Sequence, residues 1–530
     1  MIREKNKIYI CIKSVFCIFF AISLILDKMF ITKGSVFGTI EENYFTEFKI
    51  QYLICFLILF LIEFFIISVI EYIVNKIEPK IHTKNKKNIK IYFLILISIL
   101  ILWLPYTMSF FPGGIYSDTL SSINQAKGVS RLNNHHPLMY AMLLKPFFIL
   151  SDNQLAMEMF TIFQIVVMAV VCGYVAYWIY KRNISFIYVI LTTLFFGLFC
   201  LIPLYAVSIW KDIPFCLALV LYILNIGDIV KEPKKIENMK GILYYIFLSL
   251  MVSFFRNNGK YIILGTTIIL LLTYRKNIFN TLKKFTIISL VVIILTFIVQ
   301  GPIYDHFKLN TEFVENLGVL LQQICYVVSN DGEITEEQYE FINNIYPIEN
   351  IKEDYNPCIV DVIKWSQNFN SKYLEEHKNE FIKVWLEIFF RNPKACIKAQ
   401  LLNTVGFWDI NKATMDAYIN PTMWGGGNSY GGIVQKDYIE ILTNKSIRNI
   451  LIPKKAISSA IFLLITMIGA LMTIYKRKYR NFLMYVPAFI TWITIMLAVP
   501  LAYSLRYVYI LVLMIPISLI IPFLDNVEKK

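Results

Sequence analysis

Five short polar clusters interrupt the apolar stretches of this chain, and their residue types suit chemistry on phosphate and hydroxyl groups. They are Asp118, His135-His136, Lys211-Asp212, Arg256-Asn257-Asn258 and Arg506. A carboxylate can take the proton of an attacking hydroxyl, arginine binds phosphate oxygens as a bidentate fork, and lysine binds them as a point charge. Because ionisable groups close to hydrocarbon are costly, the first interpretation of such clusters is a functional site.

Each cluster also has a structural explanation when it is taken alone. Asp118 precedes a plausible helix start and could be its N-cap. His135-His136 precedes Pro137, which favours a first helical turn, so the pair could cap that helix. The lysine and arginine side chains could anchor helix ends by snorkelling to the membrane interface. The functional interpretation therefore depends on where the clusters lie relative to one another.

The segments between the clusters are apolar enough to cross a membrane. Of 530 residues, 57% are hydrophobic and 17% are charged, whereas about a quarter are charged in soluble domains. Runs of roughly 17–25 apolar residues span a bilayer, so we predict an all-α polytopic membrane protein with about 12 transmembrane helices. The predicted spans are 8–26, 51–74, 91–110, 155–180, 184–204, 212–229, 242–255, 259–274, 285–301, 455–475, 481–499 and 503–523.

The distribution of basic residues orients these spans. Lysine and arginine collect in short loops, at 76–90, 181–182, 231–240, 275–284 and 476–480. By the positive-inside rule these loops and both termini are cytoplasmic, which puts all five polar clusters at the extracytoplasmic edge. The net charge of +14 lies in these loops and not in a basic stripe with aromatics, so we expect no nucleic-acid partner. Frequent Ile, Lys and Asn suggest a bacterial plasma membrane.

Three regions follow from this topology. Residues 1–301 form an N-terminal transmembrane region with nine helices and a first extracytoplasmic loop at 111–154. Within that loop, 138–150 is apolar but only 13 residues long, so we interpret it as interfacial or re-entrant. Residues 302–454 form a mainly helical extracytoplasmic domain, and 455–530 contain the last three spans. In the domain we predict a capping box at Thr335–Gln338, helices at 373–390 and 393–407, and a glycine-rich loop at 425–432.

Three motifs of common soluble enzymes do not occur in the sequence. It contains no Walker A motif, Rossmann glycine pattern or HExxH. The nine cysteines show no C-x-x-C spacing, which argues against a zinc site. An outward-facing enzyme does not meet ATP or nucleotide sugars, so we expect its activated substrate to arrive attached to a membrane lipid, most simply as a lipid phosphate.

Two motifs in the first external loop resemble the GT-C superfamily of polytopic glycosyltransferases, which includes protein mannosyltransferases and aminoarabinose transferases. They are Tyr116-Ser-Asp118 and Asn134-His-His-Pro-Leu138. A closer resemblance is to a poorly characterised bacterial family of GT-C-like membrane proteins. It rests on Pro112-Gly-Gly with Asp118, Trp210-Lys-Asp-Ile-Pro214, Arg256-Asn-Asn-Gly259, Gln322-Gln-Ile with Asp331 to Glu337, and Arg506-Tyr507.

The resemblance implies a role for the first-loop aspartate as a base or a metal contact. GT-C enzymes often have an Asp-Glu pair there, whereas this chain has Asp118-Thr119. No cofactor is therefore certain. A divalent cation (Mg or Mn) stays possible, with Asp118, His135 or His136 as its contacts.

Together, the clusters and the resemblance predict a membrane glycosyltransferase. It would move a sugar from a polyprenyl-phosphate donor to a hydroxyl of a cell-envelope glycan, lipid or protein, with inversion at the anomeric carbon. Asp118 would be the general base, and 302–454 with loop 425–432 would select the acceptor. The expected donor-binding residues are Lys211, Arg256, Arg506, His135 and His136, supported by Asp212, Asn257 and Asn258.

Two alternatives come from other classes of protein. A transporter or flippase for lipid-linked glycans should have charged or broken helices near mid-membrane. Glu63 and Glu71 in the second span are the clearest charges of this kind, and Pro487 and Pro516 are modest breaks. A scaffold protein, in contrast, has no need of an acid, a histidine pair and three cations at one face.

Overall fold

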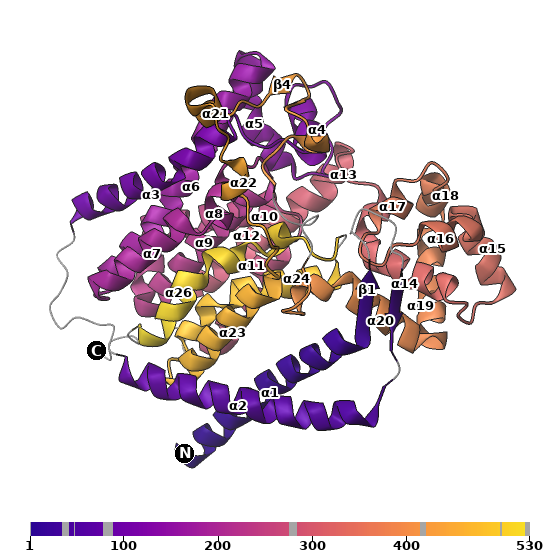
Figure 1. Cartoon of the computed structure of the whole chain (residues 1–530), viewed down its shortest axis with the longest axis horizontal. Coiled ribbons are helices and arrows are strands. Elements are labelled where there is room, and N and C mark those ends of the chain that lie inside the picture. Colours follow the sequence, from indigo (N-terminus) through magenta and orange to yellow (C-terminus); the bar gives the residue numbers. More distant parts are fainter. Residues whose placement is uncertain are drawn as a thin grey trace.

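The structure is a computed structural model that describes residues 2–33, 42–46, 48–77, 88–274, 283–413, 420–498 and 501–524. Across these residues the fold is almost entirely helical, with two small two-stranded sheets (Figure 1). Six described helices are long and apolar enough to cross a membrane: Lys7–Met29, Ile50–Lys76, Ile89–Ser109, Asn153–Lys181, Asp212–Lys231 and Phe285–His306. Other apolar helices are shorter. The all-α membrane class agrees with the sequence, and the predicted count of about 12 spans stays a prediction.

The N-terminal residues form a long helical hairpin, which crosses the lower part of Figure 1. Its elements are α1 (Ile2–Met29), β1 (Phe30–Lys33), β2 (Glu42–Phe45) and α2 (Ile50–Lys76), with β1 antiparallel to β2. Lys13 Nζ lies 2.8 Å from Glu71 Oε1 and donates to Ser68 Oγ at 2.7 Å. Glu71, a residue that favoured the transporter alternative, therefore belongs to a buried ion pair that joins the two helices.

The main bundle contains helices from both halves of the chain, and its first helices follow one another from α3 onward. They are α3 (Ile89–Ser109), α4 (Ser117–Ala126), α5 (Leu138–Leu150), α6 (Asn153–Lys181), α7 (Phe186–Leu198), α8 (Leu201–Ala206), α9 (Asp212–Lys231), η1 (Pro233–Ile236), α10 (Met239–Phe255), α11 (Gly259–Tyr274) and α12 (Lys283–Ile298). The 13-residue α5 extends only about 20 Å at 1.5 Å per residue, which is short of the hydrocarbon thickness. Its length therefore fits the interfacial or re-entrant interpretation.

One predicted span is divided in the structure. The single helix expected at 184–204 is wrong, because α7 ends at Leu198 and α8 begins at Leu201. Pro203 has no N–H, and in a continuous helix its ring would clash with the carbonyl of Phe199. Phe199 accordingly has an extended backbone, with φ −69° and ψ 105°.

Residues 304–403 add a group of short helices at the right of Figure 1. They are α13 (Tyr304–His306), η3 (Phe313–Asn316), α14 (Gly318–Ser329), α15 (Glu336–Ile345), α16 (Ile348–Asp354), α17 (Asp361–Lys364), α18 (Ser371–Glu376), α19 (Lys378–Arg391) and α20 (Pro393–Asn403), preceded by the π-helical turn η2 (Val299–Ile303). Leu321, Phe341 and Ile388 belong to a hydrophobic core of this group, separate from the core of the bundle.

The sequence predicted this group only in part. The capping box is confirmed, since the Gln338 backbone N–H donates to Thr335 Oγ1 and the Thr335 N–H donates to Gln338 Oε1. The single helix expected at 373–390 is wrong: it is interrupted at His377, whose ring nitrogen lies 2.8 Å from the Tyr373 carbonyl oxygen. The helix expected at 393–407 ends at Asn403.

The chain then returns to the bundle through short elements. They are η4 (Val405–Phe407), η5 (Trp424–Gly426), β3 (Ser429–Tyr430), β4 (Ile433–Val434), α21 (Tyr438–Thr443) and α22 (Arg448–Leu451). Phe407, Met423 and Ile433 are buried in the core of the bundle. Gln435 Nε2 donates to the carbonyls of Phe110 and Gly113 at 3.2 and 3.0 Å. The predicted glycine-rich loop 425–432 contains β3 and leads into β4, and Gln435 just after β4 bonds to the chain that leads to Asp118.

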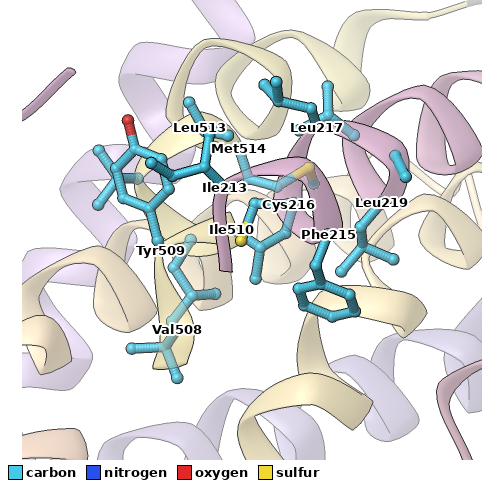
Figure 2. Packing of buried hydrophobic residues seen from close by; sticks show 14 of the residues in the cluster. Ile213, Phe215, Cys216, Leu217, Leu219, Val508, Tyr509, Ile510, Leu513 and Met514 are labelled. Atoms are coloured by element: carbon cyan, nitrogen blue, oxygen red, sulfur yellow. The ribbon is translucent and has the colours of Figure 1, made fainter. Parts of the chain in front are cut away.

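The last segment packs against the bundle, and its residues 501–524 are mostly buried. It consists of α23 (Ser459–Tyr475), η6 (Asn481–Met484), α24 (Val486–Leu497), η7 (Leu505–Val508), α25 (Ile510–Leu513), α26 (Ile515–Ile520) and η8 (Ile521–Phe523). The continuous helix expected at 503–523 is wrong: the helical turns begin at Leu505 and are divided at Tyr509 and Met514. In the later part, Pro516 and Pro522 remove helical hydrogen bonds. Figure 2 shows residues 508–514 packed against α9, where Ile213 and Cys216 lie near Ile510. This packing fixes η7 beside the start of α9.

The Lys13–Glu71 pair gives a testable expectation for the hairpin. Lys13→Met leaves a buried carboxylate without its cation and should lower the free energy of unfolding by about 3 kcal/mol. Lys13→Met/Glu71→Leu should recover most of that loss. Thermal denaturation of the detergent-solubilised chain measures both, with Lys352→Met in the exposed pair with Asp331 as the control. A Lys13→Met protein as stable as wild type would contradict this account.

Candidate functional site

A tight turn after α3 places Asp118 against the chain that precedes α9. Gly113 has φ +104°, and a Cβ there would lie 2.6 Å from the Val207 carbonyl oxygen. The Gly114 N–H donates to that same oxygen at 2.9 Å, and the Ile209 N–H donates to the Gly114 carbonyl at 3.0 Å. Glycine is therefore required where the two segments meet.

The helix that follows this turn does not use Asp118 as its cap. The N-cap of α4 is Tyr116, without a side-chain cap bond, and Asp118 lies in the first turn. The capping alternative is therefore wrong, and the carboxylate is directed to other partners.

Four side chains from distant parts of the sequence meet at this point, and we call them the ionic centre: Asp118, His136, Lys211 and Arg506. Asp118 Oδ2 lies 3.3 Å from Lys211 Nζ and 3.0 Å from Arg506 Nη1. His136 Nδ1 lies 2.6 Å from Lys211 Nζ. The side chains of Asp118, Lys211 and Arg506 are 26%, 19% and 16% exposed, so the centre is largely buried but open to a ligand.

Aromatic rings hold the Arg506 guanidinium in place. The Arg506 guanidinium lies 4.1 Å from the ring centroid of Trp210, and Trp210 stacks on Tyr116 at 4.1 Å. Arg506 Nη2 also donates to Tyr507 Oη at 3.1 Å. Lys211 immediately follows Trp210 and directly precedes α9. A stacked, hydrogen-bonded guanidinium loses little further freedom when it binds a planar or tetrahedral anion.

The protonation states of the centre follow from burial and charge. Burial alone would raise the pKa of Asp118, but Lys211 and Arg506 outweigh it and hold that pKa well below its usual value. Burial and the charge of Lys211 both hold the pKa of His136 well below its usual value. His136 is therefore neutral at pH 7, and its Nδ1 accepts from Lys211 because an ammonium can only donate. Two cations and one carboxylate leave one positive charge in excess.

His135 has different neighbours from His136. Its Nδ1 lies 3.5 Å from Glu315 Oε2, and its ring meets Trp365 edge to face at 5.8 Å. Glu315 also accepts from the buried Lys364 at 2.8 Å. Burial lowers the pKa of His135, with Glu315 opposing that effect. His135 therefore ties the first loop to the helices of 304–403, while its partner His136 contacts the centre.

The predicted cation Arg256 belongs to an adjacent ion pair. Arg256 Nη1 lies 3.1 Å from Asp212 Oδ1 and donates to the Tyr507 carbonyl at 3.0 Å. The Asp212 side chain is only 3% exposed, so its charge needs this partner. The structure thus brings two of the three predicted cations, Lys211 and Arg506, to Asp118, whereas the third, Arg256, forms an ion pair with Asp212.

The two asparagines after Arg256 fix the turn between α10 and α11. Asn257 Nδ2 donates to the Asn134 carbonyl at 3.0 Å, and Asn134 Nδ2 donates to Asn257 Oδ1 at 2.9 Å. Asn258 Nδ2 donates to Thr494 Oγ1 at 2.8 Å on α24. Both residues therefore support the site by positioning its segments.

The residues of the centre do not fit a divalent cation. Among the residues that the structure describes, no group of three or more His, Cys, Asp or Glu side chains is close enough to hold a metal. Asp118, the carboxylate of the centre, already lies between the positive charges of Lys211 and Arg506, which repel a metal ion. The possible Mg or Mn contact therefore finds no support in this arrangement.

Sequence reasoning gave no role to Trp210 and Tyr507, although both rings contact the Arg506 guanidinium in the structure. The signal that could have found them is adjacency, since Trp210 directly precedes Lys211 and Tyr507 directly follows Arg506. Glu315 and Lys364 had no comparable signal, because only the fold brings them to His135.

A protein family matches most of the chain. A family described as a family of unknown function, DUF6020, matches residues 125–530. The chain belongs to the DUF6020 family. No curated protein and no solved structure matches it. The part that matches DUF6020 includes His136, Lys211 and Arg506, whereas Asp118 precedes it.

The low pKa of Asp118 predicts how stability depends on pH. Its pKa is lower in the folded than in the unfolded state, so the ionised carboxylate stabilises the fold above about pH 4 and the effect is lost as the pH falls through the folded-state value. Asp118→Asn should cost about 1–3 kcal/mol at pH 5–8. The difference in Tm between wild type and variant should shrink only below about pH 4.

Thermal melts of the full chain between pH 3 and 8 make this measurement. Asp331→Asn is the control, since Asp331 pairs with Lys352 but its side chain is 83% exposed. An Asp118→Asn protein with the same Tm as wild type at pH 7 would contradict the expected stabilisation.

Proposed function

We propose that this protein is a membrane glycosyltransferase that moves a sugar from a polyprenyl-phosphate donor to an acceptor hydroxyl. The single observation that supports the proposal most is the ionic centre, in which one carboxylate meets Lys211 and Arg506 with one positive charge in excess. In the predicted topology the centre faces the outside of a bacterial plasma membrane, where a lipid-linked donor is the accessible activated sugar. The GT-C resemblance of the first loop agrees with this assignment.

Donor binding would use the cations that hold Asp118 in the resting protein. Arg506, fixed against Trp210, presents its guanidinium to phosphate oxygens, and Lys211 adds a second positive charge. His136 holds the Lys211 ammonium from the other side. The donor phosphate would therefore compete with Asp118 for both cations.

This competition would also convert Asp118 into a base. In the resting protein its low pKa makes the carboxylate a weak proton acceptor. Once a phosphate shares Lys211 and Arg506, their effect on Asp118 weakens and the pKa rises towards its ordinary value. Donor binding would therefore precede activation of the acceptor.

The chemical step balances with these groups alone. The acceptor hydroxyl gives its proton to Asp118 while its oxygen forms a bond to the anomeric carbon of the sugar. The bond from that carbon to the phosphate oxygen breaks, and its electron pair stays on the lipid phosphate. Lys211 and Arg506 stabilise the charge of the leaving phosphate, and Asp118 later releases its proton to water. Attack opposite the leaving group gives inversion.

The first test compares the glycans of cells that lack the protein, cells restored with wild type, and cells restored with Asp118→Asn. Mass spectrometry of surface glycans and lipid-linked sugars should show one sugar lost from an acceptor in the deletion, returned by wild type and not by Asp118→Asn. Asp331→Asn at equal abundance is the matched control. Full restoration by Asp118→Asn would remove the proposed base and favour the transporter alternative.

A second test examines the role of Arg506 in donor binding. Arg506→Lys keeps the charge but removes the fork and the stack on Trp210, so kcat/KM for the donor should fall by about 10²–10³-fold. The purified chain, supplied with the lipid-linked sugar that the first test identifies, provides the assay. Arg391→Lys, on the outer face of α19, is the control. Activity within a factor of two of wild type would exclude Arg506 from donor binding.

A further inference from the structure

A polar pocket of 390 Å³ lies where the first loop and the turn between α10 and α11 meet the residues 300–378. Five of its lining side chains are amides: Asn134, Asn257, Gln300, Asn310 and Asn316. Its size falls in the range of pockets that bind small molecules, but its lining is polar where most such pockets are apolar. Amides both donate and accept hydrogen bonds, so this wall suits a ligand with many hydroxyl groups.

The charges in the pocket cancel, unlike those of the ionic centre. Its two carboxylates, Asp305 and Glu375, face two ammonium groups, Lys260 and Lys378. Glu375 and Lys378 form an ion pair, and Asn310 donates to Asp305. With no positive charge in excess, the pocket favours an uncharged ligand over a phosphate.

Two side chains of the pocket are ready to bond to such a ligand. Within the described part of the chain, the side chains of Thr311 and Asn316 make no hydrogen bond. Glu375 Oε2 accepts from the Phe313 backbone N–H at 3.0 Å, which holds this carboxylate against the same segment. The 311–316 segment therefore presents both a hydroxyl and an amide to the cavity.

Neighbouring residues link the pocket to the ionic centre, since Asn134 of the pocket lies two positions before His136 of the centre. Asn134 and Asn257, which pair through their amides, are each one residue away from His135 and Arg256. Consecutive Cα atoms are about 3.8 Å apart, so a ligand in the pocket lies close to the side chains of His135 and Arg256. Asp212, the partner of Arg256, directly follows Lys211 of the ionic centre.

We propose that this amide-rich pocket binds the acceptor, and that the acceptor is an uncharged, hydroxyl-rich molecule such as a sugar unit of a glycan. This inference rests on the proposed function, because it places the donor phosphate at the ionic centre and the acceptor beside it. A lipid or protein carrier of that sugar would lie outside the pocket, since the pocket offers one aromatic side chain, Phe313, and otherwise mainly polar groups.

The test is direct binding to the full chain in a detergent without a sugar headgroup. Saturation-transfer NMR would use methyl glycosides of glucose, galactose, mannose and N-acetylglucosamine as probes. At least one should bind wild type, and Thr311→Val/Asn316→Leu should bind it about tenfold more weakly or worse, because two hydrogen bonds are lost. Asn344→Leu, an exposed asparagine on α15, is the matched control.

The outcomes separate this inference from the proposed function. Asp118→Asn should bind the glycoside like wild type while it loses sugar transfer. If none of the four probes binds wild type, or if the pocket variant binds as tightly as Asn344→Leu, the acceptor pocket is wrong. If the pocket variant loses binding but Asp118→Asn transfers sugar normally, the pocket stands and the proposed base falls. Thr311→Val alone, which is nearly isosteric, keeps the test valid if the double variant does not fold.

Discussion

The ion pairs of Asp118 with Lys211 and Arg506 are the interaction on which this site depends. They join residues 93 and 388 positions apart in the sequence, at a place where water is mostly excluded. A carboxylate so placed needs cations, and cations so placed need an anion, so the three groups hold one another. Because two cations meet one carboxylate, the same interaction leaves an excess positive charge, which is the property that a phosphate-binding site requires.

The surrounding packing determines how closely these charges can meet. Residues 508–514 lie buried against α9 (Figure 2). The Tyr205 ring also stacks on Tyr509 at 3.8 Å. These apolar contacts position Arg506, two residues before 508, at the start of α9. On the other side, Gly113 and Gly114 let the first loop approach the backbone at Val207. The polar geometry is thus set by a hydrophobic core and by glycines at a close backbone contact.

The helices of 304–403 extend the site outward. Glu315, with His135 on one side and Lys364 on the other, joins these helices to the first loop. The amide-rich pocket lies along the same boundary. A transferase with a charged donor and an uncharged acceptor needs two sites of different charge. A cationic centre beside a neutral polar pocket meets this need, because each substrate then binds its own site better than the site of the other substrate.

The sequence by itself determined the membrane class and the helical content, because hydropathy and charge are local properties. It also determined the capping box at Thr335, where both partners lie within one turn. Only the tertiary structure decided that Arg256 pairs with Asp212, that His136 and not His135 meets Lys211, and that Trp210 holds Arg506. The breaks at Phe199 and His377 were also missed. The choice among equally plausible partners depends on packing between residues far apart in the chain, and no local pattern encodes it.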